Sequence, residues 1–135
     1  MSEPLALPRH EGLRLAEIAG RGRGLITIAP IGAGTLIEAA PVLALPESAS
    51  PARENPLFDY PFAWDGRGGP EAIAFGLVSM VNHDPDPNGR VEPDLPNLVI
   101  RLFARRDILP GEEITVDYAI PLWWEEGAHA DRALL

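Results

Sequence analysis

Hydrophobic and polar residues alternate over several short stretches of the chain. Residues 13–18 (LRLAEI) and 25–28 (LITI) have an approximate period of two, which is typical of β-strands with one buried face. The apolar run at 98–103 (LVIRLF) predicts the clearest strand of the chain. Further short strands are expected at 35–38, 42–45, 58–64 and 114–116.

Glycine and proline interrupt this pattern along the whole chain. The 13 Gly and 15 Pro make up about a fifth of the 135 residues, which predicts many short elements joined by turns. An irregular loop is expected at 46–56, and residues 72–80 fit a strand that leads into a short helix. The sequence has no heptad and no long amphipathic helix pattern. It therefore predicts a mostly β fold of several small sheets with one or two short helices.

The length favours one domain with a real hydrophobic core. Residues 1–11 contain two Pro and few apolar anchors, so a loose N-terminal tail is expected there. The domain itself is expected to span residues 12–124. Residues 125–135 are expected to form a C-terminal tail or a short helix.

Composition and charge limit the kinds of ligand that we expect. The formal net charge is −9 and all 11 basic residues are Arg, a balance that disfavours binding to nucleic acid and favours a basic partner. The chain has no Cys, and its three His residues match no zinc motif, so no metal is expected. No signal peptide and no apolar run of ~18 residues is present, which predicts a cytoplasmic protein without membrane contact.

A glycine-rich segment and an acidic segment are candidates for ligand binding. Residues 20–24 (GRGRG) are not followed by a helix pattern, so a phosphate loop is disfavoured and a flexible turn is the simplest interpretation. Residues 111–118 (GEEITVDY) contain adjacent carboxylates, which point to opposite faces of a strand, so Glu112 and Glu113 are expected to be exposed to solvent. The phenol of Tyr118 could hold a polar ligand from an apolar wall.

The segment 81–88 (VNHDPDPN) crowds turn-forming residues directly after an apolar run. Asn, Asp and Pro form turns for local reasons, so a structural turn is the simplest interpretation. His83 has an ordinary pKa near ~6.5, which suits proton transfer at neutral pH. No Ser or Cys nucleophile is recognisable beside it, so a small hydrolase that uses His83 is only a third hypothesis.

Taken together, these segments resemble the SET domain, the fold of most protein-lysine methyltransferases. The family's opening Gly-x-Gly turn is matched at 22–24, its Asn-His-Ser and Pro-Asn motif at 82–88, and its final Gly-Glu-Glu-Leu-Thr-x-Asp-Tyr motif at 111–118. The three motifs occur in the family's order across most of the chain. The aromatic stretch at 60–64 also resembles the compact bacterial members of the family.

The resemblance implies a SET-domain, β-clip-like fold with a knot-like C-terminal crossing, and an enzyme that transfers methyl groups from S-adenosylmethionine to a protein lysine. Asn82 would hydrogen-bond the amino-acid end of the cofactor, and the backbone of His83 would meet its adenine. Tyr118 would be the principal catalytic residue and Tyr60 a second wall of the lysine channel. The implied cofactor-binding residues are Gly22, Arg23, Gly24, Leu25, Asn82, His83 and Tyr118.

Three departures from the family pattern leave an alternative open. Asp84 stands where the family usually has Ser, the region between Leu45 and Phe58 is short, and the cysteine-rich flanks of many members are absent. A catalytically weak SET-like module that binds the cofactor or a basic peptide is therefore the alternative function. The expected partner is a lysine-rich, basic protein. It must be another protein, because this sequence contains no Lys; a homodimer is left open.

Overall fold

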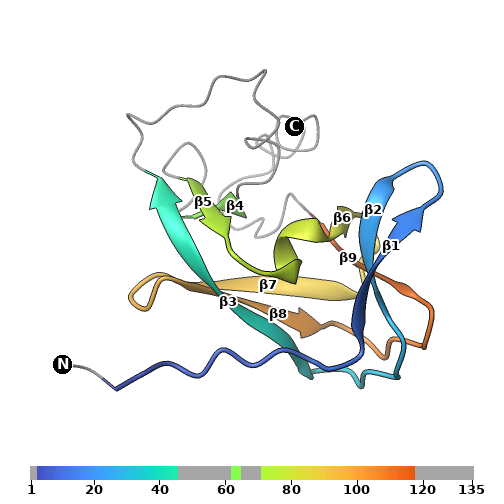
Figure 1. The fold of residues 1–135 in the computed structure, drawn as a ribbon, viewed down its shortest axis with the longest axis horizontal. Coiled ribbons are helices and arrows are strands. Elements are labelled where there is room, and N and C mark those ends of the chain that lie inside the picture. Colours follow the sequence, from blue (N-terminus) through green and yellow to red (C-terminus); the bar gives the residue numbers. More distant parts are fainter. Residues whose placement is uncertain (1–2, 46–61, 65–70, 118–135) are drawn as a thin grey trace.

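The computed structural model describes residues 3–45, 62–64 and 71–117, which form two small β-sheets (Figure 1). The first sheet has the strand order β1-β2-β9-β6 and the second the order β4-β5-β3-β8-β7. The first sheet consists of β1 (Leu13–Ile18), β2 (Gly22–Thr27), β9 (Glu113–Val116) and β6 (Asn82–His83). The second consists of β4 (Phe62–Ala63), β5 (Glu71–Ala74), β3 (Leu36–Leu45), β8 (Val99–Ala104) and β7 (Gly89–Asp94). The prediction of a mostly β fold of small sheets is confirmed.

The glycine-rich segment is mainly a strand and not a flexible turn, which corrects the simplest interpretation of its sequence. β1 and β2 form an antiparallel hairpin that begins at the pair Ile18 and Gly22, so the turn spans only residues 19–21. The backbone N–H of Arg21 donates to the carbonyl of Ile18 and closes this turn. Gly20 and Gly22 have φ angles of 78° and 74°, a left-handed conformation that glycine adopts without steric cost.

The strands predicted at 35–38 and 42–45 are one continuous strand, β3, in the centre of the larger sheet. The sequence interpretation ended the first strand at Glu38 and began the second at Val42, and Pro41 lies between them. In the structure the carbonyl of Pro41 accepts from the N–H of Phe75, and the N–H of Val42 donates to the carbonyl of Leu98. The chain therefore keeps its sheet hydrogen bonds on both sides of the proline.

Residues 71–83 run from one sheet to the other. The predicted strand and short helix are confirmed as β5 and the 3₁₀ helix η3 (Leu77–Met80), and β6 follows directly. None of the helices in the described part of the chain is long and apolar enough to cross a membrane. The predicted loop at 46–56 and residues 58–61 of the predicted aromatic strand lie outside the described residues.

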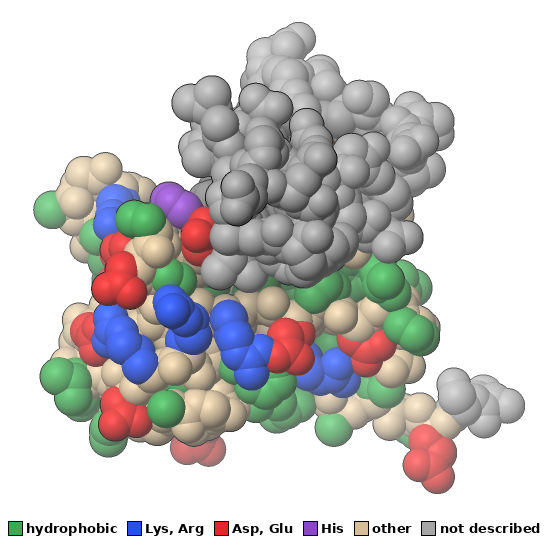
Figure 2. All heavy atoms as spheres, turned by 180° about the vertical axis from the view of Figure 1, so that it is seen from behind, with side chains coloured by type: hydrophobic (Ala, Val, Ile, Leu, Met, Phe, Trp, Pro, Cys, Tyr) green, Lys and Arg blue, Asp and Glu red, His purple; other side chains and the backbone are tan. Residues whose placement is uncertain are grey.

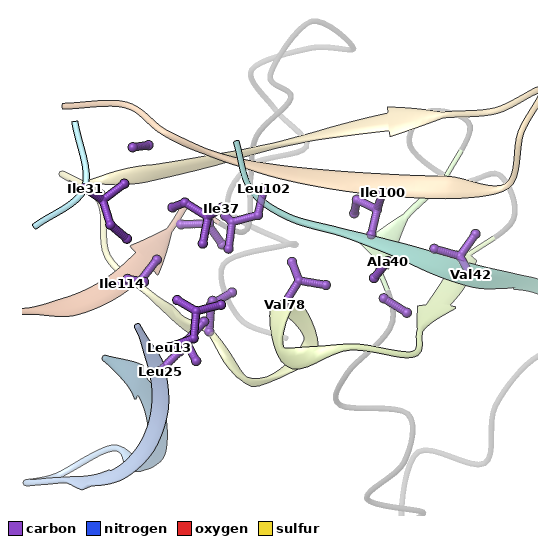
Figure 3. Close-up of a cluster of buried hydrophobic side chains, with 14 of the residues drawn as sticks. Leu13, Leu25, Ile31, Ile37, Ala40, Val42, Val78, Ile100, Leu102 and Ile114 are labelled. Carbon is purple, nitrogen blue, oxygen red and sulfur yellow. The ribbon is translucent and has the colours of Figure 1, made fainter. Parts of the chain in front are cut away.

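The hydrophobic core joins the two sheets through η3. Val78 of η3 is fully buried, and η3 contacts β2, β3 and β5. Figure 3 shows Val78 between Leu25 and Ile114 of the first sheet and Ala40 and Ile100 of the second, and all five belong to one buried cluster. Packing against both sheets therefore fixes the position of η3. It also fixes where β6 begins, because β6 follows η3 in the chain.

A buried carboxylate also holds the start of η3. Glu38 of β3 is 1% exposed, and its oxygens accept from the backbone N–H groups of Leu77 at 3.1 Å and Val78 at 2.7 Å. The guanidinium of Arg9 pairs with the same carboxylate at 2.8 Å. Within the segment expected to be a tail, residues 8–10 thus run along β3, and the N–H of His10 donates to the carbonyl of Ile37.

Candidate functional site

The three motifs meet at the centre of the four-stranded sheet. β9 pairs with β2 on one side, where Leu25 lies opposite Ile114, and with β6 on the other. The β6–β9 pairing is parallel and places Asn82 opposite Thr115. Figure 1 shows β2, β9 and β6 grouped at one end of the molecule. Three segments separated by dozens of residues in the sequence therefore build one site.

The side chain of Asn82 lies between the two other motifs. Its Nδ2 donates to Glu113 Oε2 at 2.7 Å and to the carbonyl oxygen of Arg23 at 3.2 Å. Gly24 lies directly against this pair. A Cβ at residue 24 would come within 2.6 Å of Glu113 Oε2, 2.7 Å of Ile18 Cγ1 and 2.8 Å of Asn82 Nδ2. Only glycine allows the strand to approach Asn82 this closely.

Glu113 belongs to the site, so the prediction of a solvent-exposed side chain was wrong. Its side chain is 16% exposed, and its second oxygen, Oε1, accepts from Arg21 at 3.2 Å. The prediction failed because the alternation of β9 gives no information about what covers each face. Asn82 and Arg21, which cover Glu113, lie 31 and 92 residues away in the sequence.

Glu112 is also partly buried, and it has different partners from Glu113. It accepts from the backbone N–H of Leu109 at 2.9 Å and pairs with Arg106 at 3.2 Å. The Leu109 N–H, and then Arg106 and Asn88, hold the pKa of the Glu112 carboxyl below its ordinary value of 4.5. Glu112 therefore stabilises the turn before β9. Its side chain is 31% exposed, so it meets solvent only in part.

Asp84, the residue that departs from the family pattern, contacts two neighbouring groups through its carboxylate. Its Oδ1 accepts from the backbone N–H of Asp86 at 2.9 Å, and its Oδ2 lies 3.5 Å from a guanidinium nitrogen of Arg21. The Asp86 N–H, and then Arg21, hold the pKa of Asp84 below its ordinary value of 3.8. Arg21 thus carries the positive charge between two carboxylates, those of Asp84 and Glu113.

His83 lies in β6, opposite Val116 of β9. Its Nδ1 is 3.6 Å from Oδ1 of Asp117, and its side chain is half-buried. Ser79, the hydroxyl residue that precedes this motif, donates to the carbonyl of Ala74 at 2.6 Å. That hydroxyl therefore ties η3 to the end of β5, and it is not committed to His83 as a nucleophile.

The structure describes some of the remaining predicted site residues and not others. The side chain of Leu25 is fully buried in the core, so only its backbone can meet a ligand. Tyr118 and Tyr60 lie outside the described residues. Over residues 3–45, 62–64 and 71–117, no three His, Asp or Glu side chains converge in a way that could hold a metal ion.

Comparison with known proteins agrees with this arrangement. A family model described as the SET domain matches residues 22–119. The chain is 34% identical over 118 residues to the histone-lysine N-methyltransferase, H3 lysine-37 specific, of Schizosaccharomyces pombe. The aligned region covers 86% of this chain and 79% of that protein. A crystal structure of a candidate histone methyltransferase of Plasmodium falciparum has a similar fold, with a TM-score of 0.68 and 21% identity over 84% of this chain and 98% of that one. The chain belongs to the SET domain family.

Proposed function

We propose that this protein transfers a methyl group from S-adenosylmethionine to a lysine side chain of a basic protein. The observation that carries this proposal is the contact of Asn82 with Arg23 and Glu113, since it joins the three segments that resemble the family's motifs. The similarity to a histone-lysine methyltransferase over 86% of the chain supports the same reaction.

The residues of the site fit the cofactor. Gly24 lets the strand pack directly against the side chains of Asn82 and Glu113, which holds both polar groups in place at the site. The carboxylates of Asp84, Glu113 and Asp117 give the site negative charge, which suits a ligand with an ammonium group and a sulfonium group. When bound, the cofactor supplies a methyl group on a positively charged sulfur.

The lysine amine must be neutral before it can accept the methyl group. A free lysine has a pKa near ~10.4, and burial close to a positive charge lowers that pKa. We assign the orientation of the amine to the hydroxyl of Tyr118, which follows Asp117 directly in the sequence, and a second channel wall to Tyr60. An oriented polar oxygen is suited to this task because the displacement requires the nitrogen lone pair and the methyl group to be in line.

The charges of the protein support a lysine-rich substrate. Figure 2 shows a band of Arg side chains across one face, with acidic side chains beside them. Three arginines pair with neighbouring carboxylates: Arg90 with Glu92, Arg101 with Asp94, and Arg106 with Glu112. Each pair cancels one positive and one negative charge, so the excess of acidic residues is unchanged. The net charge of −9 acts at long range and favours basic segments such as histone tails.

A methyl-transfer assay read by mass spectrometry tests the proposal. The substrates are a histone H3 peptide around lysine 37, the same peptide with that Lys replaced by Arg, and a matched acidic peptide. The expected result is the addition of methyl mass to the lysine peptide alone, at a rate that falls as the Debye length shortens from ~30 Å at ~0.01 M salt to ~8 Å at ~0.15 M. Cofactor binding without transfer to this peptide or to the host's basic proteins would favour a catalytically weak binding module.

A further inference from the structure

We infer that Glu113 is a positioning residue for the cofactor and that it acts by fixing the side-chain amide of Asn82. This inference rests on the proposed function, because it concerns how the same site recognises the amino-acid end of its ligand. It assigns a role to the carboxylate that the sequence pattern placed in solvent.

The orientation of the Asn82 amide is determined by its partners. Nδ2 faces two oxygen atoms, the carboxylate Oε2 of Glu113 and the carbonyl oxygen of Arg23. If the amide were rotated by half a turn, Oδ1 would face both acceptors and no hydrogen bond would form. Nδ2 is therefore committed within the protein, and Oδ1 is the atom of this side chain left to bind a ligand. No residue in the described part of the chain donates to it at hydrogen-bond distance.

An oxygen acceptor selects the chemistry of the group that it meets. Oδ1 can accept from an ammonium group and cannot pair with a carboxylate. Asn82 is therefore oriented to accept a hydrogen bond from the α-ammonium group of an amino-acid ligand, and Glu113 maintains this orientation. The negative charge of Glu113 strengthens this arrangement, since hydrogen bonds to an ionised acceptor are stronger than neutral ones.

Arg21 holds Glu113 in turn. Its guanidinium donates to Oε1 of Glu113 at 3.2 Å, which leaves Oε2 for Asn82, and it lies 3.5 Å from Asp84. The two contacts draw the turn between β1 and β2 towards both other motifs. The contacts thus run in order from Arg21 through Glu113 to Asn82.

The test is a double-mutant cycle on the affinity for S-adenosylhomocysteine, the demethylated cofactor, measured by calorimetry. The variants are Glu113→Ala, Asn82→Ala and the double variant. Glu113→Ala should weaken binding about three- to tenfold in the wild-type background and less than about twofold in the Asn82→Ala background. Glu112→Ala is the matched control, because it removes the neighbouring carboxylate and its ion pair with Arg106 but does not touch Asn82. It should change the affinity less than about twofold.

A second ligand separates positioning from a general structural effect. 5′-Methylthioadenosine keeps the adenosine part and lacks the amino-acid end, so Glu113→Ala should leave its affinity unchanged. Equal losses for both ligands, additive effects in the cycle, or no loss at all would overturn the inference while leaving the cofactor site intact. If the wild-type protein binds neither ligand, the proposed function fails and the inference fails with it. Should Glu113→Ala not fold, Glu113→Gln takes its place in the cycle and is expected to retain part of the affinity, because its Oε1 can still accept from Asn82.

Discussion

The side chain of Asn88 pairs with the backbone of β9 as a neighbouring strand would. Its Oδ1 accepts from the N–H of Thr115 at 2.9 Å, and its Nδ2 donates to the carbonyl of Glu113 at 2.7 Å. Asn88 is only 2% exposed, so these two hydrogen bonds are shielded from water. The Pro-Asn part of the central motif thus stabilises the strand that carries the last motif.

Replacing Asn88 by Ala should destabilise the protein substantially. The change leaves a buried N–H and a buried carbonyl of β9 without partners, at a cost of about 1–3 kcal/mol for each. We therefore expect the free energy of unfolding in urea to fall by about 2–6 kcal/mol, the sum of the two costs. Asn97→Ala is the control, because Asn97 is exposed and, among the described residues, hydrogen-bonds through its side chain only to Asp94. It should cost less than about 1 kcal/mol. Equal losses in the two variants would contradict this role for Asn88.

Gly24→Ala should impair the cofactor site. Its backbone has an ordinary φ, so the effect comes from the new methyl group, which would come within 2.6 Å of Glu113 Oε2 and 2.8 Å of Asn82 Nδ2. We expect affinity for S-adenosylmethionine to fall at least about tenfold and stability to fall by about 1–3 kcal/mol. At Gly32 a new methyl group would find its nearest contact at 3.7 Å, so Gly32→Ala should change neither property. An unaltered affinity in Gly24→Ala would show that this close approach does not matter for binding.

Tyr118→Phe should affect the chemical step and not cofactor binding. Phenylalanine keeps the ring and removes the oxygen that we assign to the lysine amine. Turnover should fall at least about tenfold, because an oriented polar group at a reacting centre is commonly worth ~10²-fold or more. Calorimetry with S-adenosylmethionine should give the same affinity for both proteins. Equal rates of methyl transfer by the two proteins in single-turnover assays would show that the Tyr118 hydroxyl takes no part in the chemical step.

Acid should weaken the fold in a defined range of pH. The pKa values of Asp84, Asp94 and Glu112 lie below their ordinary values, Asp94 chiefly because the guanidinium of Arg101 donates to it at 2.8 Å. Such groups stabilise the folded state above their unfolded pKa values, and this contribution is lost as the pH falls through the lower folded values. The melting temperature should therefore be nearly constant from about pH 7 to about pH 5 and should decline below the unfolded values of 4.5 for Glu and 3.8 for Asp.

Asp94→Asn provides the check on this pH dependence. Its side chain cannot ionise, so the variant should be slightly less stable than the wild type at neutral pH and should lose less stability on acidification. The difference is expected to be small, because the pair is partly exposed and screened by water. Parallel melting profiles for the two proteins would show that the Asp94–Arg101 pair does not contribute to acid sensitivity.

The alternation of hydrophobic and polar residues predicted several of the strands. It could not predict strands that form because they pair with segments distant in the sequence. β8 and residues 25–27 of β2 were recognised because buried side chains recur in them with a period of two. β1 was recognised from the alternation of its sequence, although Leu13 is its only buried side chain. β6 has only two residues and exists because it pairs with β9, about thirty residues later. β7 contains Gly89 and Pro93, which predict a turn when read locally, yet it pairs with β8 over its full length.

The site shows the same division between local and distant information. The motifs identified Asn82 and Gly24, since those residues have the spacing and type that the resemblance requires. Glu113 was misplaced because its environment is made by Arg21 and Asn82, which come from two other elements. Glu38 gave no local signal, because a carboxylate within a strand is normally exposed. It is buried here because the N–H groups of η3 and the guanidinium of Arg9 satisfy its oxygens.

Calorimetric titration of S-adenosylmethionine into the wild-type protein and Asn82→Ala tests the central claim, that the meeting point of β2, β6 and β9 is a cofactor site. We predict saturable binding with one site per chain for the wild type. Removing a hydrogen bond to a charged group costs roughly 1.5–3 kcal/mol, so Asn82→Ala should bind about ten- to a hundredfold more weakly. No saturable binding by the folded wild type at millimolar cofactor, or equal affinity in the two proteins, would contradict the claim.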